Sequence, residues 1–431
     1  MEIIEILVLL ISFITLLILG VPIAFSIGIA GALTLVISIL PVPAFTTLAQ
    51  RMAVALNSFA LLAIPFFVLA GQIMNQGGIA IRLIEFAKVL VGRLPGGLAL
   101  VNITANMLFG AISGSAAAAS SAIGSFMTPK MHSEGYDKGY SVAVNVTSAT
   151  SGLVIPPSNI MIVYSLASGG VSIAALFLAG YIPGILMGLG LMLTAAAIAY
   201  RRNYPVGEKV GFKPGVMKFL DALPSIFLLV VVIGGIIAGI FTATEASAVA
   251  VVYTLILALV YKQIKMSHFP GILLRTVGIT SIVMLLIGTS MGLSWVMSYA
   301  NIPQAVGEGL LAISTDKIVL LILINIMLLI VGTFMDMTPA VLIFTPIFLP
   351  VVAELGVDPI HFGIIMIMNL CVGLVTPPVG SVLFIGCSVA NIGIEKVIKP
   401  LIPMFLAMIA VLLLITYFPE ISLWLPRVLG Y

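Results

Sequence analysis

The stretch GLVIPP at residues 152–157 recurs 221 positions later as GLVTPP at residues 373–378, and each copy lies inside a long apolar segment. Proline has no backbone N–H, so each pair of prolines removes helical hydrogen bonds and frees carbonyls one turn earlier. Free carbonyls inside a membrane are tolerated only where they meet water, protein or an ion. The two copies therefore predict two helices, each broken at its prolines.

At the first break the carbonyls of Gly152 and Leu153 are expected to be free, and at the second those of Gly373 and Leu374. The glycines leave room for a small ligand beside the backbone, and Thr376 adds a hydroxyl. A small hard cation held by oxygens suits such a place. The alternative is a proline kink whose carbonyls are paired by water or by a Ser or Thr side chain.

The composition places these motifs in a membrane protein. Hydrophobic residues make up 61% of the 431 positions and charged residues 8%, whereas a soluble domain has about 25% charged residues. Soluble enzymes, nucleic-acid binders and disordered chains are thereby excluded, and an all-α polytopic membrane protein is predicted. Cys371 and Cys387 are expected to be buried free thiols. Glu2 and Glu5 argue against a signal peptide and favour a retained first helix.

Apolar segments divide the chain into ten predicted crossings and two hairpins. The crossings are expected at about 3–20, 22–41, 55–75, 139–165, 170–200, 222–241, 244–261, 274–298, 357–392 and 400–418. The stretches 97–127 and 317–352 are too long for one crossing and are rich in Gly, Ser or Pro, so each is predicted to enter and leave on one side.

Positive charge supports this topology. The predicted topology places 15 of the 18 Lys and Arg residues in the cytoplasm and three outside, and it places both termini outside. The cytoplasmic set is Arg82, Lys88, Arg93, Lys130, Lys138, Arg201, Arg202, Lys209, Lys213, Lys218, Lys262, Lys265, Arg275, Lys396 and Lys399, and the outer set is Arg51, Lys317 and Arg427.

The two halves of the chain are predicted to be inverted repeats. The offset of 221 also pairs Pro129 with Pro350 and Leu108 with Leu329. Each half has five crossings, an odd number, so the second half is expected upside down relative to the first. Inverted repeats with broken helices are typical of secondary transporters whose site lies at mid-membrane.

The predicted organisation follows from these repeats. Residues 79–93 and 301–313 each carry an apolar face and are interpreted as arms lying along opposite membrane surfaces, the alternative being ordinary amphipathic loop helices. The segments are 1–75 (scaffold, repeat 1), 76–96 (cytoplasmic arm), 97–200 (hairpin 1, broken helix and following helix), 201–221 (cytoplasmic linker), 222–298 (scaffold, repeat 2), 299–316 (external arm) and 317–431 (hairpin 2, broken helix and last helix).

Polar residues mark both hairpins. The first carries GAISGS at residues 110–115, where Ser113 and Ser115 can offer oxygens. The second carries Asp336, which could ligate a cation or cap the returning helix. Hydroxyls and an amide flank the first break and could line a polar cavity or join helices: Ser148, Thr150, Ser151, Ser158 and Asn159. Because no Arg or Lys was expected to be buried near these motifs, an anionic solute would rely on helix N-termini, hydroxyls and bound cations.

Together these motifs resemble the large membrane subunit of a tripartite ATP-independent periplasmic (TRAP) transporter, within the wider ion-transporter superfamily. The similarity covers essentially the whole chain and rests on the Ser-Gly-Ser hairpin with its alanine run, on TSATSGLVIPPSNIMIVY at 147–164 and on VGLVTPPVGSVLF at 372–384. It implies a sodium-coupled, elevator-type importer of an organic acid, such as a dicarboxylate or a sialic acid, in the bacterial inner membrane. It also implies two partners, a separate four-helix membrane subunit and a periplasmic substrate-binding protein.

The resemblance further implies particular sites. One Na⁺ site would be formed by Ser113, Ser115, Gly152, Ile155 and Pro156, and the other by Gly332, Thr333, Gly373, Thr376 and Val379. The substrate would meet Ser113, Pro157, Ser158, Asn159, Asp336 and Pro378.

Other functions remain open at this point. The nearest is a stand-alone dicarboxylate or citrate carrier of the same superfamily, which would need no binding protein. An ion channel is a second alternative. An intramembrane enzyme is disfavoured because the chain has no H-E-x-x-H motif, and the absence of a Walker A loop argues against ATP use.

Overall fold

The structure, a computed structural model, describes residues 2–206 and 211–431, and all regular structure in these ranges is helical. This confirms the predicted all-α class. Eight of the described helices are long and apolar enough to cross a membrane by length and composition. Lys209, placed among the cytoplasmic charges above, and residues 1 and 207–210 of the predicted segments lie outside the described residues.

The offset of 221 found in the sequence recurs in the helix boundaries. The first hairpin consists of α6 (Gly97–Ser113) and α7 (Ala116–Ser133), and the second of α15 (Lys317–Phe334) and α16 (Met337–Glu354). Adding 221 to the bounds of α7 gives those of α16, and α6 and α15 differ from this offset by one residue at their starts. The remaining helices are α1 (Glu2–Ile18), α2 (Ile23–Ser38), α3 (Pro41–Leu56), α4 (Ala63–Gln76), α5 (Ile79–Val91), α8 (Lys138–Ser151), α9 (Asn159–Ala167), α10 (Ile173–Arg201), α11 (Phe212–Ile237), α12 (Ala243–Val260), α13 (Phe269–Tyr299), α14 (Ile302–Ile313), α17 (Pro359–Gly373), α18 (Ser381–Ala390), α19 (Glu395–Tyr417) and α20 (Glu420–Val428).

One helix of the first half is not in the sequence prediction. Residues 41–56 form α3, which leads through a short 3-10 turn at Phe59–Leu62 into α4. At the offset of 221, the stretch 41–76 corresponds to 262–297, most of which is the single long helix α13. The prolines, the glutamine and the arginine in residues 41–56 lower the hydropathy of this helix below that of a membrane span. A search of the sequence for long apolar runs therefore does not find it.

Both predicted helix breaks are present. The first broken helix ends as α8 at Ser151 and resumes as α9 at Asn159, and the second ends as α17 at Gly373 and resumes as α18 at Ser381. The prediction of free glycine carbonyls is wrong in detail. The Gly152 carbonyl accepts a turn hydrogen bond from the Ile155 N–H at 3.3 Å, and the Gly373 carbonyl accepts one from Thr376 at 2.9 Å. Each of these oxygens keeps a second lone pair for another partner.

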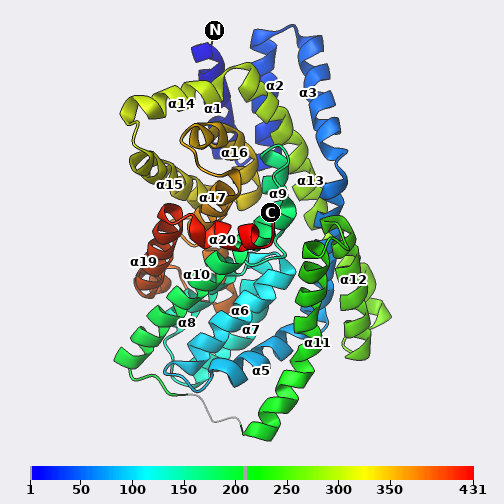
Figure 1. Cartoon of the computed structure of the whole chain (residues 1–431), viewed down its shortest axis with the longest axis vertical. Helices are drawn as coiled ribbons and strands as arrows, with labels where there is room; N and C mark the ends of the chain where they lie inside the picture. Colours follow the sequence, from blue (N-terminus) through cyan, green and yellow to red (C-terminus); the bar gives the residue numbers. More distant parts are fainter. Residues whose placement is uncertain (1, 207–210) are drawn as a thin grey trace.

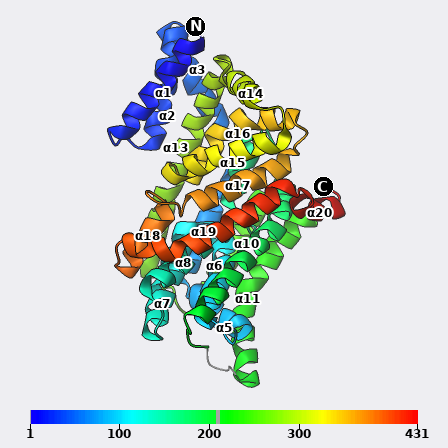
Figure 2. The same ribbon diagram turned by 90° about the vertical axis from the view of Figure 1, so that its left-hand side faces the viewer.

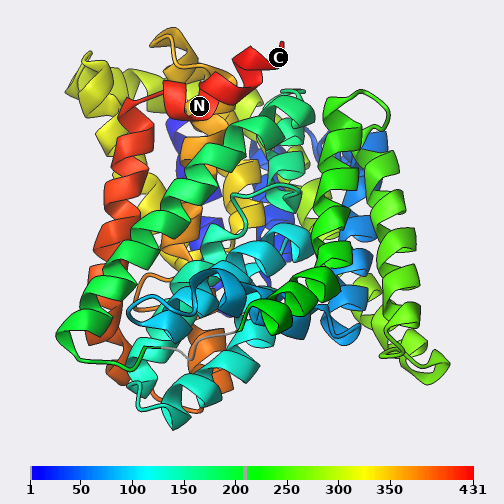
Figure 3. The same ribbon diagram turned by 60° about the horizontal axis from the view of Figure 1, so that its bottom comes forward.

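The helices form two packed groups. In the first group α2 and α3 lie against α13, and α4 packs on α12 and α13 at one side of the molecule (Figure 1). In the second group α15, α16, α17 and α19 run side by side (Figure 2). Figure 3 shows α12, with α11 beside it, along one edge and α19, beside α10, along the opposite edge. The hairpins and broken helices occupy the space between these edges.

The two halves interlock through their hairpins. The returning limb α7 of hairpin 1 packs on α18, which follows the second break, and the returning limb α16 of hairpin 2 packs on α9, which follows the first. Each hairpin therefore contacts broken helices of both halves, and residues at least 170 positions apart meet at the centre of the molecule.

Candidate functional site

Pairs of glycines fix how closely each hairpin approaches its broken helix. A Cβ atom built on Gly152 would lie 2.8 Å from the Cα of Gly110, and one built on Gly373 would lie 2.5 Å from the Cα of Gly332. Real Cβ atoms do not approach backbone so closely, so only glycine fits at these crossings. The faces of Gly152 and Gly373 are filled by neighbouring backbone, not left open for a ligand. Gly110, absent from the predicted site, is the counterpart of Gly332.

The tip of hairpin 1 lies against the first break. Gly114 adopts a left-handed conformation with φ +61°, and a Cβ built on it would lie 2.9 Å from Nδ2 of Asn159. On either side, Ser113 is buried and Ser115 caps α7 by accepting a hydrogen bond from the Ala118 N–H at 3.2 Å. The structure thus brings Ser113 and Ser115 of the predicted first sodium set together with Asn159 of the predicted substrate set.

Two oxygens just after this break have no partner in the described part of the chain. Oγ of Ser158 and Oδ1 of Asn159 are both buried without a hydrogen bond. Leaving a buried polar atom unpaired costs about 1–3 kcal/mol, so such atoms usually mark a place where a ligand, ion or water binds. These unpaired oxygens argue against simple helix joining for the two side chains.

The tip of hairpin 2 lies against the second break in the same way. The Gly380 N–H donates to the Thr333 carbonyl at 3.3 Å, and the Thr376 hydroxyl donates to the Val372 carbonyl at 2.8 Å, leaving its lone pairs free. Gly332, Thr333, Gly373 and Thr376 of the predicted second set are therefore neighbours. Val379, the remaining member, is 38% exposed.

Asp336 holds the position in hairpin 2 that Ser115 holds in hairpin 1, at the offset of 221. It is the N-cap residue of α16, but its side chain makes no capping hydrogen bond. Of the two roles open for this carboxylate, cap or ligand, the geometry favours the ligand role. Asp336 is solvent-accessible because it faces the cavity described next.

One cavity of about 650 Å³ joins these parts. It is bounded by the tips of both hairpins, by both breaks and by one face each of α4 and α13. Its volume lies in the range of about 300–1,000 Å³ that small-molecule sites occupy. Its lining includes Ser113, Ser115, Ser121, Asn159, Asp336, Thr338 and Ser381 on the hairpin and break side.

The cavity contains part of the predicted substrate set. Ser113, Asn159 and Asp336 line it, whereas Pro157, Ser158 and Pro378 do not. Pro156 and Pro157 are buried, and the Ile155 side chain packs toward Gly184 of α10. The prolines thus shape the breaks and do not face the cavity.

Three polar residues on the α4 and α13 wall of the cavity are absent from the sequence prediction. Gln72 and Asn75 on α4 and Arg275 on α13 line the cavity. The charge distribution predicts a cytoplasmic position for Arg275, and the expectation of no Arg or Lys near these motifs is wrong for this cavity. The available signal was helical spacing: 275, 278, 279, 282 and 283 share one face, as do 64, 68, 71, 72 and 75. What that face opens onto is set by tertiary packing.

Comparison with known proteins was made for the whole chain. The family model described as tripartite ATP-independent periplasmic transporter, DctM component, matches residues 10–421. The C4-dicarboxylate TRAP transporter large permease protein DctM of Rhodobacter capsulatus is 38% identical over 97% of this chain and 98% of its own length. The sialic acid TRAP transporter large permease protein SiaM of Vibrio cholerae is 36% identical over 96% of both chains.

A solved structure has the same fold. The YdaH transporter of Alcanivorax borkumensis superimposes with a TM-score of 0.66 over 89% of each chain at 13% sequence identity. At this identity the likeness extends to the fold alone.

Proposed function

Because this chain belongs to the DctM family of tripartite ATP-independent periplasmic transporters, we propose that it imports an organic anion by coupling it to sodium. It is a multi-span protein of the inner membrane and not an enzyme. We propose further that both termini face the periplasm, as the charge distribution favours. The anion is a dicarboxylate or a sialic-acid-like sugar acid, in keeping with the substrates named for the relatives.

One observation carries this proposal. A single cavity is lined by both hairpin tips, by both helix breaks and by the helices α4 and α13 of the first packed group. A solute in it would contact both halves of the chain at once. Movement of the hairpins and broken helices against α4 and α13 would then carry the solute from one side to the other, which is the elevator type of alternating access.

The two predicted sodium sites are supported by oxygen atoms at the breaks. At the second break, Gly373 packs against the backbone of Gly332, the Gly373 carbonyl accepts from the Thr376 N–H, and the Thr376 hydroxyl keeps its lone pairs for a further partner. Neutral oxygens of this kind suit an alkali cation. Each sodium ion moving down a potential of 100 mV contributes about 2.3 kcal/mol, so two ions support accumulation without ATP.

Members of the family work with a small membrane subunit and a periplasmic binding protein. We propose that this chain does the same and that the binding protein delivers the anion to the cavity. The unpartnered apolar surfaces of the helices would face lipid or the small subunit.

Uptake into proteoliposomes tests the proposal. The vesicles contain this chain with its small subunit, and they receive radiolabelled organic acids with and without sodium and candidate binding proteins. Uptake of one acid should require both an inward sodium gradient and a binding protein. Uptake that does not depend on sodium would overturn the proposed sodium coupling. Uptake without any binding protein would favour a stand-alone carrier. Single-channel currents would favour an ion channel.

A pair of matched variants tests the second sodium site. Thr376→Val should raise the sodium concentration for half-maximal uptake several-fold, because it removes a hydroxyl at the break. Thr254→Val is the control, since the Thr254 hydroxyl makes the same 2.8 Å bond to a carbonyl four residues back but lies within α12, away from the second break. Equal sodium dependence in both variants would exclude Thr376 as a ligand.

A further inference from the structure

One wall of the cavity consists of one face each of α4 and α13. Along α13 this face contains Arg275, Gly278, Ile279, Ile282 and Val283, and along α4 it contains Ile64, Val68, Gly71, Gln72 and Asn75. Most of these residues are apolar or glycine. Their three polar members are Gln72, Asn75 and Arg275.

These three polar residues lie at the same end of the wall. Ile73 of α4 and Ile272 of α13 are buried in one small cluster with Ala258 and Ile264, so the end of α4 lies beside the start of α13. Gln72 precedes Ile73, and Arg275 follows Ile272 by one helical turn. The wall is therefore apolar over most of its length and polar, with one positive charge, at this end.

Arg275 is available to bind an anion. None of the five ion pairs among the described residues includes it, whereas Arg82 and Arg427 are each paired with a carboxylate. Its guanidinium stays charged and presents donors in a planar fork that fits a carboxylate with two hydrogen bonds. The other charged residue of the lining is Asp336, on the tip of hairpin 2.

This arrangement restricts the substrate class. A second carboxylate placed near Asp336 would face a like charge, whereas a hydroxyl or an amide N–H there could donate to the aspartate. Ser113 and Asn159, on the same side, offer further partners for hydroxyl groups. A polyhydroxy acid with one carboxylate therefore matches the charges of the lining better than a dicarboxylate does.

We propose that Arg275 binds the single carboxylate of the substrate and that Asp336, on the tip of hairpin 2, selects for hydroxyl or amide groups. The substrate is then a monocarboxylic sugar acid. This inference rests on the proposed transport of an organic anion through the same cavity.

Equilibrium binding tests the inference separately from transport. Radiolabelled gluconate, galacturonate and N-acetylneuraminate, and the dicarboxylates succinate, malate and fumarate, are titrated onto the purified complex of this chain and its small subunit in sodium. At least one sugar acid should bind, and the dicarboxylates should bind at least ten-fold more weakly. Tighter binding of a dicarboxylate, or no binding of any sugar acid, would overturn the proposal.

Variants at the two charged residues complete the test. Arg275→Gln should raise the Kd of the bound sugar acid at least ten-fold, and Arg275→Lys should restore part of the affinity. Arg201→Gln, which removes an exposed charge at the end of α10 away from the lining, should leave Kd unchanged. An unchanged Kd in Arg275→Gln would exclude this residue from the site.

Asp336→Asn should bring the affinity for succinate within a few-fold of that for the sugar acid. If it instead removes the sodium dependence of binding, Asp336 is a sodium ligand and the proposed selection is wrong. Failure of sodium-driven uptake with normal, Arg275-dependent binding would contradict the transport proposal and leave the binding inference standing.

Discussion

Four glycines, two in each half, set the spacing between the hairpins and the broken helices. Gly110 faces Gly152 and Gly332 faces Gly373, with backbone against backbone at both crossings. A larger residue at one of these crossings would clash with the facing backbone, whether or not an ion binds nearby. The loss of uptake that a Gly152→Val or Gly373→Val change would cause therefore cannot by itself identify a cation site.

At the residue scale we predict that Gly373→Ala lowers thermal stability. The added Cβ would lie 2.5 Å from the C and Cα atoms of Gly332, and overpacking of this kind costs about 1–3 kcal/mol. Thermal unfolding of the purified protein measures the effect. Gly234→Ala is the matched control because a Cβ on Gly234 meets nothing within 4 Å. Equal melting temperatures for the two variants would show that the crossing can relax.

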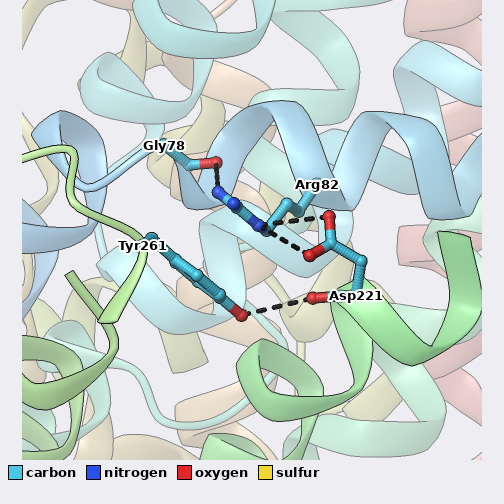
Figure 4. A network of polar contacts seen from close by, with 4 residues as sticks. All are labelled: Gly78, Arg82, Asp221 and Tyr261. Atoms are coloured by element: carbon cyan, nitrogen blue, oxygen red, sulfur yellow. Dashed lines mark hydrogen bonds and ion pairs between the residues drawn. The ribbon is translucent and has the colours of Figure 1, made fainter. Parts of the chain in front are cut away.

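At the scale of elements, the arm helix α5 is tied to the first packed group by polar contacts (Figure 4). The Arg82 Nε lies 3.2 Å from both carboxylate oxygens of Asp221 on α11, and its guanidinium stacks 3.5 Å from the ring centroid of Tyr261. The Tyr261 hydroxyl in turn donates to the Asp221 carbonyl at 3.2 Å. The arm predicted at 79–93 thus joins α11 and the end of α12, close to the polar end of the cavity wall.

A second set of contacts lies one turn further along the arm. Glu85 pairs with Lys218 at 2.7 Å and with Lys88, and the Phe86 ring lies 5.8 Å from that of Phe219. Burial alone would raise the pKa of Glu85, but hydrogen bonds and charges from Lys218 and Lys88 outweigh it and lower that pKa. Because the pKa of Glu85 is lower in the folded protein than its ordinary value, the ionised carboxylate stabilises the fold at pH values above that ordinary pKa. The contribution is lost as the pH falls through its folded pKa.

At this scale we predict that Arg82→Gln lowers the melting temperature at low ionic strength and less at high ionic strength. It removes a partly exposed ion pair and a cation–π contact, each worth about 0.5–1 kcal/mol, and salt screens the ion pair. Arg427→Gln breaks the exposed pair with Glu420 near the C-terminus and should have a smaller effect. A salt-independent loss in Arg82→Gln would assign the stabilisation to packing instead of charge.

At the scale of the whole molecule, the bounds of both hairpins and of both helix breaks follow the offset of 221 to within two residues, whereas α3 and α4 correspond to the single helix α13. Whether the halves have opposite orientations relative to the membrane stays a prediction, based on the odd number of crossings and on the charge asymmetry. The connection after hairpin 1 should then face the cytoplasm and the connection after hairpin 2 the outside.

Single cysteines at equivalent positions test this inversion. Ser133 and Glu354 are the last residues of α7 and α16, are 221 positions apart and are exposed. In a background with Cys371→Ala and Cys387→Ala, Glu354→Cys should react with a membrane-impermeant thiol reagent in right-side-out vesicles, and Ser133→Cys only in inside-out vesicles. Reaction of both from one side would disprove inverted halves.

The sequence by itself determined the features that depend on neighbouring residues. Proline pairs broke the two helices, long apolar runs marked most spans and the small polar residues marked both hairpin tips, because backbone hydrogen bonding and hydropathy are local properties. It missed α3, whose polar residues and prolines make a packed helix look like a loop. Only the tertiary structure decided that Gly110 faces Gly152 and that Arg275 shares a cavity with Asp336. Those relations join faces of distant helices, and which faces meet is set by packing across the whole fold.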